Sequence, residues 1–93
     1  MWAQHVENEA RKLAKISNLP KGWTTEVWVR AAIFGVNGES FSEREFYNHY
    51  QNEFKLLYPN NHNISEKISE QFTVFLKKKY RLIDGDNGIY RIQ

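Results

Sequence analysis

The segment YRLIDGDNGIYRI, residues 80–92, decides whether this chain is a purely helical domain or one that ends in a β-hairpin. Apolar and polar residues alternate on both sides of DGDNG, which is the pattern of two short strands. Asn87 and Gly88 stand between them, and both residue types tolerate the positive φ that a two-residue hairpin turn requires. We therefore predict a C-terminal β-hairpin with Asn87-Gly88 at its turn.

Two helices are expected in the first part of the chain. Residues 2–17 carry apolar side chains at three- and four-residue steps, as amphipathic helices do, and NLPKG then interrupts the pattern. A second, more apolar helix begins after Thr24 or Thr25, since either residue can cap it. Because it is so rich in apolar residues, it is expected to be the most buried element, and it ends at Gly35 or Gly38.

A short extended stretch, GESF, precedes a third helix over roughly residues 43–57. Ser42 and Glu45 have the spacing of a capping box, in which each side chain accepts a hydrogen bond from the other's free backbone N–H. Pro59 ends the helix. Four side chains at regular spacing are predicted to be buried: Phe46, Tyr50, Phe54 and Leu57.

A fourth helix is expected from residue 64 to about Lys79, with Asn63 and Glu66 as a second cap of the same kind. At 100° per residue one side is apolar, with Gln71 near it, and the opposite side is a polar ridge. The apolar side carries Ile64, Ile68, Phe72, Phe75 and Leu76. The ridge carries Glu66, Glu70, Thr73 and Lys77, flanked by Ser69 and Val74.

The order helix, helix, short strand, helix, helix, hairpin is that of a winged helix-turn-helix. We therefore predict an α+β, mainly α fold. Residues 1–20 are expected to form an N-terminal helical extension, and residues 21–93 the winged-helix domain. In DNA-binding members of this fold, the last core helix lies in the major groove. The hairpin, or wing, contacts the backbone or the minor groove.

The composition fits one small domain with a real core. Six Phe, five Tyr and three Trp supply large apolar surfaces, and Trp28 is expected in the core more firmly than Trp23. The absence of cysteine excludes disulfides and thiolate metal sites. No stretch approaches the ~20 apolar residues of a membrane span, and the N-terminus lacks the order of a secretory signal. A cytoplasmic domain is expected.

The sequence contains no recognisable catalytic or metal-binding motif. It has no nucleophile elbow, no glycine-rich phosphate loop and no paired carboxylates at metal-binding spacing, so neither catalysis nor a cofactor is predicted. His5, His49 and His62 lack ligand spacing, so no metal site is expected. Asp84 and Asp86 resemble the start of a calcium loop without its later ligands, and a turn is predicted instead.

The run from FSEREF to GIYRI, including LYPNN and KISEQF, resembles the small C-terminal winged-helix domain of DpnI-like (Dam-replacing) restriction endonucleases and related stand-alone domains. The resemblance covers about residues 24–92. It implies a DNA-binding domain, linked in that family to recognition of methylated adenine, without the nuclease domain. The family's Arg and Gln on the recognition helix are replaced by Ser69, Glu70 and Thr73, and only Gln71 matches.

The positive charge gathers at the end of the chain. Residues 1–60 hold seven Lys/Arg and seven Asp/Glu, whereas residues 74–93 hold five cations against two Asp. Such asymmetry points to an anionic partner. From the fourth helix, its N-terminal loop and the hairpin we predict these DNA-contacting residues: Asn61, His62, Asn63, Ser65, Lys67, Ser69, Glu70, Thr73, Lys77, Lys78, Lys79, Arg81, Asn87 and Arg91.

Simpler interpretations stay open. The ridge with Glu66 and Glu70 can equally be read as a solvated helix face or as a surface for protein contact. Lys77, Lys78 and Lys79 also stabilise a helix C-terminus through the helix dipole. Our leading hypothesis is a non-catalytic domain that binds double-stranded DNA, methylated or not, in a restriction or DNA-modification system. The alternative is a winged-helix module for protein contact, as a homodimer or as part of a larger enzyme.

Overall fold

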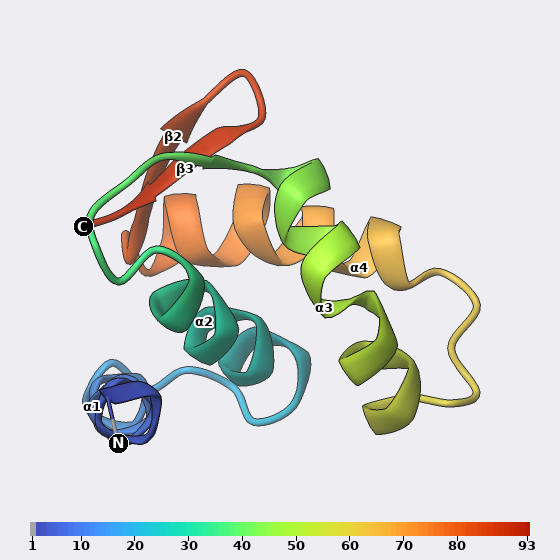
Figure 1. Cartoon of the computed structure of the whole chain (residues 1–93), viewed down its shortest axis with the longest axis horizontal. Helices are drawn as coiled ribbons and strands as arrows, with labels where there is room; N and C mark the ends of the chain where they lie inside the picture. The colour runs from blue at the N-terminus through green and yellow to red at the C-terminus, as the bar shows by residue number, and fades with distance from the viewer. Residues whose placement is uncertain (1) are drawn as a thin grey trace.

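The computed structural model describes the backbone of residues 2–93 and the side chains from Gln4 onward, so the predicted apolar side chain of Trp2 lies outside the described ones. In the part that is described, four α-helices, one π-helix and three short strands follow each other (Figure 1). They are α1 (Trp2–Ile16), α2 (Trp23–Phe34), β1 (Phe41–Ser42), α3 (Glu43–Leu57), α4 (Ile64–Glu70), η1 (Gln71–Lys79), β2 (Ile83–Asp86) and β3 (Ile89–Ile92). The predicted α+β, mainly α order is confirmed.

The C-terminal segment forms the predicted hairpin. β2 and β3 pair antiparallel, and β1 adds to β3 to give the sheet order β1-β3-β2. Asn87 and Gly88 have φ values of 55° and 78°, as the two-residue turn requires. Gly85 is needed for a different reason, because a Cβ there would collide with the carbonyl oxygen of Ile89. The wing is therefore a tightly fixed two-stranded ribbon.

Aromatic side chains from all three core helices and the sheet build the interior. Phe46 of α3 lies 5.0 Å from Phe72 of η1, measured between ring centroids, and Phe72 lies 4.8 Å from Tyr90 of β3. Trp28 is buried, as predicted. Trp23 is half-buried and stacks on Tyr58 at 4.1 Å. The core thus ties the wing to the helix that precedes it.

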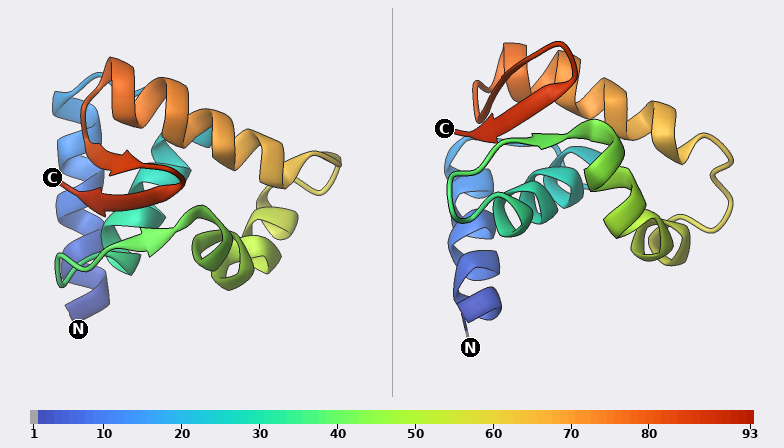
Figure 2. Two further views of the ribbon diagram at one scale, coloured as in Figure 1. Left: turned by 90° about the horizontal axis from the view of Figure 1, so that it is seen from above. Right: turned by 45° about the horizontal axis from the view of Figure 1, so that its top comes forward.

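Helix α1 packs against α2 and runs crosswise to it (Figure 2). Ala10 and Ala14 are buried against it, and the indole N–H of Trp28 donates to the carbonyl oxygen of Ala10 at 3.3 Å. Arg11 reaches Glu26 of α2 at 3.3 Å. The predicted division at residue 20 stays a prediction, but α1 covers part of the buried core.

Of the predicted caps, only the capping box of Ser42 and Glu45 is confirmed. The N–H of Glu45 donates to Ser42 at 3.0 Å, and the N–H of Ser42 donates to Glu45 at 3.3 Å. Thr25 does not cap α2, because Gly22 takes the N-cap position and the Thr25 hydroxyl donates to the carbonyl oxygen of Pro20. Thr24 is used elsewhere, in a bond to Gln71.

Two further expectations were wrong. The side chain of Asn63 makes no cap hydrogen bond, because the loop before α4 folds on itself and the N–H of Asn63 donates to the side chain of Asn61. Leu57 is 44% exposed, since α3 ends at this residue and its last turn lies beyond the core.

The predicted fourth helix is continuous but changes type. α4 passes directly into η1, whose hydrogen bonds run from residue i+5 to residue i, as from the N–H of Tyr80 to the carbonyl of Phe75 at 2.8 Å. The wider turn displaces the outward side chains from the 100° spacing. Thr73 and Lys77 are half-buried, and Val74 and Lys78 are exposed in their place.

Gln71 marks the start of the π-helix. It is 3% exposed, and it accepts a hydrogen bond of 2.5 Å from the Thr24 hydroxyl of α2. The prediction that it lies near the apolar side is confirmed. The bond fixes the beginning of η1 against the beginning of α2.

Candidate nucleic-acid interface

The helix formed by α4 and η1 presents two rows of side chains outside the core. Its outermost row, here called the ridge, consists of the exposed residues Glu66, Glu70, Val74 and Lys78. A second row on the wing side begins at Ser65 and continues at four-residue steps through Ser69, Thr73 and Lys77. On the other side, Gln71 contacts α2 and Tyr80 contacts the α1–α2 turn.

The wing tip stands beside the start of α3 and faces α4. A groove of about 500 Å³ runs between them, and its walls include Ser65 of α4, Asn87 of the turn and Arg44 of α3. The N–H of Glu43 donates to the carbonyl oxygen of Gly88 at 3.1 Å, which holds the tip in place. Two predicted site residues, Ser65 and Asn87, therefore meet in one groove.

A second hollow of about 440 Å³ continues from this groove. It contains the predicted loop residues Asn61, His62 and Asn63, and it shares Tyr47 and Ser65 with the first. Lys55 lies in its wall. The loop before α4 and the wing tip are thus connected along one face of the molecule.

Three residues of this face were not predicted: Arg44, Tyr47 and Lys55. All three belong to α3, which was interpreted only as a core helix with a capping box. Their charges and hydroxyl were visible in the sequence. What the sequence lacked was the position of the wing tip against the first turn of α3.

The three consecutive lysines do not form one cluster. Lys77 lies in the wing-side row, Lys78 ends the ridge, and Lys79 turns to the other side, because neighbouring residues of a helix point in different directions. The Lys79 ammonium lies 5.5 Å from the ring centroid of Tyr80. Arg81 follows with a φ of 54° in the turn towards β2 and is exposed.

Arg91 lies apart from the lysines. It stands on the outer face of the hairpin, in register with Asp84, and its guanidinium is 3.7 Å from that carboxylate. Asp86 lies on the same strand face, two residues from Asp84. Arg91 therefore belongs to an acidic patch of the wing rather than to one basic edge with the lysines.

Ion pairs neutralise only part of the charge. Among the side chains that the structure describes, Lys67 pairs with Glu70 at 4.0 Å, and four other cations also have carboxylate partners. The eight cations without an ion pair in this part of the chain are Lys15, Lys21, Arg44, Lys55, Lys77, Lys78, Lys79 and Arg81. These are the charges available to an anionic partner.

The buried tyrosines have structural roles. Burial raises the pKa of Tyr90 to about 12, and the nearby Glu43 carboxylate acts in the same direction. The Tyr90 hydroxyl therefore stays protonated and donates to Glu43 at 3.2 Å. Burial also raises the pKa of Tyr50 to about 12. Among the described residues, no group of three or more His, Asp or Glu side chains is arranged to hold a metal ion.

Three core helices, a β1 strand and a paired hairpin beside the last helix define the chain as a winged helix-turn-helix domain. Within residues 2–93, no helix combines the length and apolar character needed to cross a membrane. The model of the Dam-replacing HTH domain matches residues 20–91, and the chain belongs to that family. No curated protein and no solved structure matched the chain.

Proposed function

We propose that the chain is a non-catalytic domain that binds double-stranded DNA through the α4–η1 helix and the wing. The observation that carries this proposal is the groove that joins Ser65, Asn87 and Arg44 beside the exposed ridge. In winged-helix complexes the last core helix enters the major groove and neighbouring elements contact the phosphates. The family described above is a helix-turn-helix family, which supports the same function.

Each part of the surface has a separate role in this proposal. Ser65, Ser69, Glu70 and Thr73 lie nearest the bases, where a carboxylate selects the cytosine amino group. Arg44 and Lys55 bind phosphate from α3, and Lys77 and Lys78 do so from η1. Arg91 contributes least, because Asp84 already holds it. Asn61, His62 and Asn63 contact DNA from the loop.

Binding to a labelled duplex, followed by fluorescence anisotropy over a salt series, tests the proposal. Log affinity is expected to fall linearly with log salt, by about 0.9 per phosphate contact. Arg44→Ala is expected to reduce the slope by about 0.9 and to weaken binding about eightfold at ~0.1 M salt. Lys12→Ala is the control, because Lys12 lies on α1 and pairs with Glu9 at 3.9 Å.

DNA binding is ruled out if the wild type shows no measurable affinity at ~50 mM salt, or an affinity that does not change with salt. The link to a restriction or DNA-modification system is tested separately, with one duplex prepared with and without methylated adenine. A preference between the two supports the link, and equal affinity removes that part of the proposal.

One observation favours protein contact as a second candidate function. Leu13 and Ile16 of α1 are 39% and 76% exposed and border an apolar groove between α1 and α2. Deleting residues 1–20 would not test this, since it would also uncover Trp28. Sedimentation of the Leu13→Glu/Ile16→Glu variant is the cleaner experiment. A wild-type dimer that the variant loses supports the second function, and a wild-type monomer at high concentration excludes it.

A further inference from the structure

The unpaired cations gather at one end of the molecule. Six of the eight lie on the C-terminal half of α1, the α1–α2 turn, or the end of η1 and the residues after it: Lys15, Lys21, Lys77, Lys78, Lys79 and Arg81. Among the described side chains, the five carboxylates without an ion pair all lie elsewhere, towards α3, α4 and the sheet. They are Glu39, Glu43, Glu45, Glu66 and Asp86. Unpaired positive charge therefore extends from the end of η1, where predicted site residues lie, to Lys15 and Lys21 beside it, which were not predicted.

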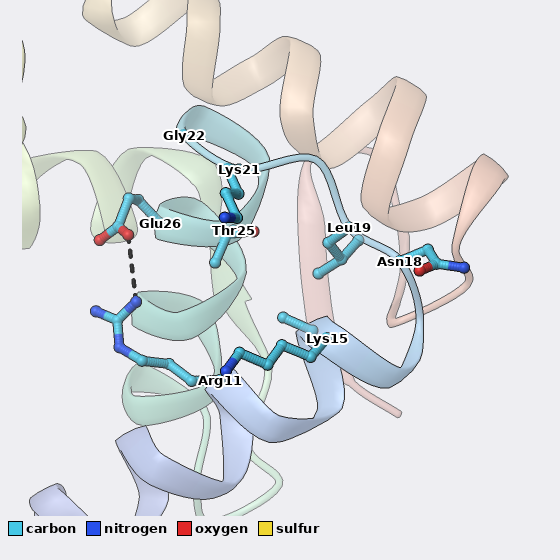
Figure 3. Close-up of a pocket in the computed structure, with 9 residues that line it drawn as sticks. Arg11, Lys15, Asn18, Leu19, Lys21, Gly22, Thr25 and Glu26 are labelled. Atoms are coloured by element: carbon cyan, nitrogen blue, oxygen red, sulfur yellow. Dashed lines mark hydrogen bonds and ion pairs between the residues drawn. The ribbon is translucent and has the colours of Figure 1, made fainter.

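Two of these cations line a cavity between α1 and α2. The cavity has a volume of about 490 Å³, with Lys15 on the α1 side and Lys21 on the α2 side (Figure 3). Gly22 in its rim has a φ of 101°, and a Cβ at that position would meet no atom within 4 Å. The cavity is open to solvent there, and its volume is large enough for a phosphate group.

The one carboxylate in the cavity wall does not repel an anion. Glu26 accepts hydrogen bonds from Arg30 at 2.8 Å and from Arg11 at 3.3 Å. Burial tends to raise the pKa of Glu26, but these two arginines outweigh it and lower the pKa below the ordinary value. The negative charge is thus fixed and neutralised, and Lys15 and Lys21 remain uncompensated.

The cavity lies on the side of the α4–η1 helix opposite the wing. The carbonyl of Asn18, in the cavity wall, accepts a hydrogen bond from the Tyr80 hydroxyl at 3.4 Å, and Lys79 lies over the Tyr80 ring. Thr24, two residues beyond Gly22, bonds to Gln71. A helix in the major groove, which is about 12 Å wide, has a phosphate backbone on each side. With the α4–η1 helix in such a groove, the wing side would face one backbone and the cavity the other.

We propose that this cavity holds a backbone phosphate of bound DNA, and that Lys15 and Lys21 neutralise it. The inference rests on the proposed DNA binding and adds to it a contact from α1, which lies outside the matched family residues. The two strands of the duplex are then held by different parts of the chain, one by α3 and the wing and the other by α1 and its turn.

The test compares the salt dependence of duplex binding for the full chain and for Lys15→Ala/Lys21→Ala. Loss of this phosphate contact is expected to reduce the slope of log affinity against log salt by about 0.9, and to weaken binding about eightfold at ~0.1 M salt. Lys12→Ala, one turn before Lys15 on the same helix, is expected to bind as wild type does. Circular dichroism of each variant checks that α1 still folds.

The outcomes separate the two proposals. If the wild type binds DNA and the double variant binds with the same affinity and slope, the cavity contact is overturned and DNA binding stays supported. A wild type that does not bind overturns both. A third experiment titrates the wild type with inorganic phosphate at matched ionic strength and monitors the amide NMR signals of Gly22 and Thr25. If those signals move with free phosphate while the double variant binds DNA normally, the cavity is a free-anion site and the inference is wrong.

Discussion

Replacing Thr24 by Val tests how the recognition helix is held. The change keeps the shape of the side chain and removes the hydroxyl that donates to Gln71 at 2.5 Å. Thr24 and Gln71 are 4% and 3% exposed, so water does not readily replace the lost donor. A buried polar group left without its hydrogen bond costs about 1–3 kcal/mol. We expect the free energy of unfolding to fall by about 2 kcal/mol.

Urea and thermal unfolding followed by circular dichroism measure this loss. For a domain of this size, about 2 kcal/mol lowers Tm by roughly 8–16 °C. The double variant Thr24→Val/Gln71→Leu removes both partners and is expected to recover much of the stability, since replacing both with apolar groups of similar shape is nearly neutral. A Thr24→Val variant within ~0.5 kcal/mol of wild type, or a double variant less stable than the single one, would refute the reasoning.

Three further predictions concern other parts of the fold. Ser42→Ala removes the cap of α3 and is expected to cost about 1 kcal/mol in the same urea experiment, whereas an unchanged midpoint would contradict the capping role. Gly88→Ala places a side chain at a φ of 78° and is expected to destabilise the wing, which hydrogen exchange of the β3 amides would report as faster exchange. Glu26 has a lowered folded pKa, so its contribution is present above its ordinary pKa and is lost as pH falls through the folded value. Glu26→Gln is therefore expected to flatten the acid side of the stability–pH curve, and an unchanged curve would exclude that contribution.

The sequence predicted the order of elements because its signals are local. Asn87-Gly88 determines a hairpin turn, and Ser42 with Glu45 determines the start of a helix, from a few adjacent residues. Both are seen in the structure. The apolar spacing likewise identified Trp28, Phe46 and Phe54 as core residues.

Several of the errors share one physical origin, which is that the interactions involved are not local. Thr24 was a good cap by type, but its hydroxyl bonds to Gln71, which is 47 residues away. Ridge positions after Glu70 were assigned with the α-helical period, and the π-helix shifted them by one residue. The position of Lys15 and Lys21 near the end of η1 depends on the contact between the α1–α2 turn and Tyr80, which no short segment encodes.

The change from α4 to η1 has a geometric consequence for a partner that lies along the helix. On an α-helix, residues four apart drift sideways by about 40° per turn, so such a row winds away from any straight surface. The wider π turns counter this drift after Glu70, and the row from Glu66 to Lys78 stays outward for its whole length. The ridge therefore forms a straight edge parallel to the helix axis, acidic at its N-terminal end and cationic at its C-terminal end.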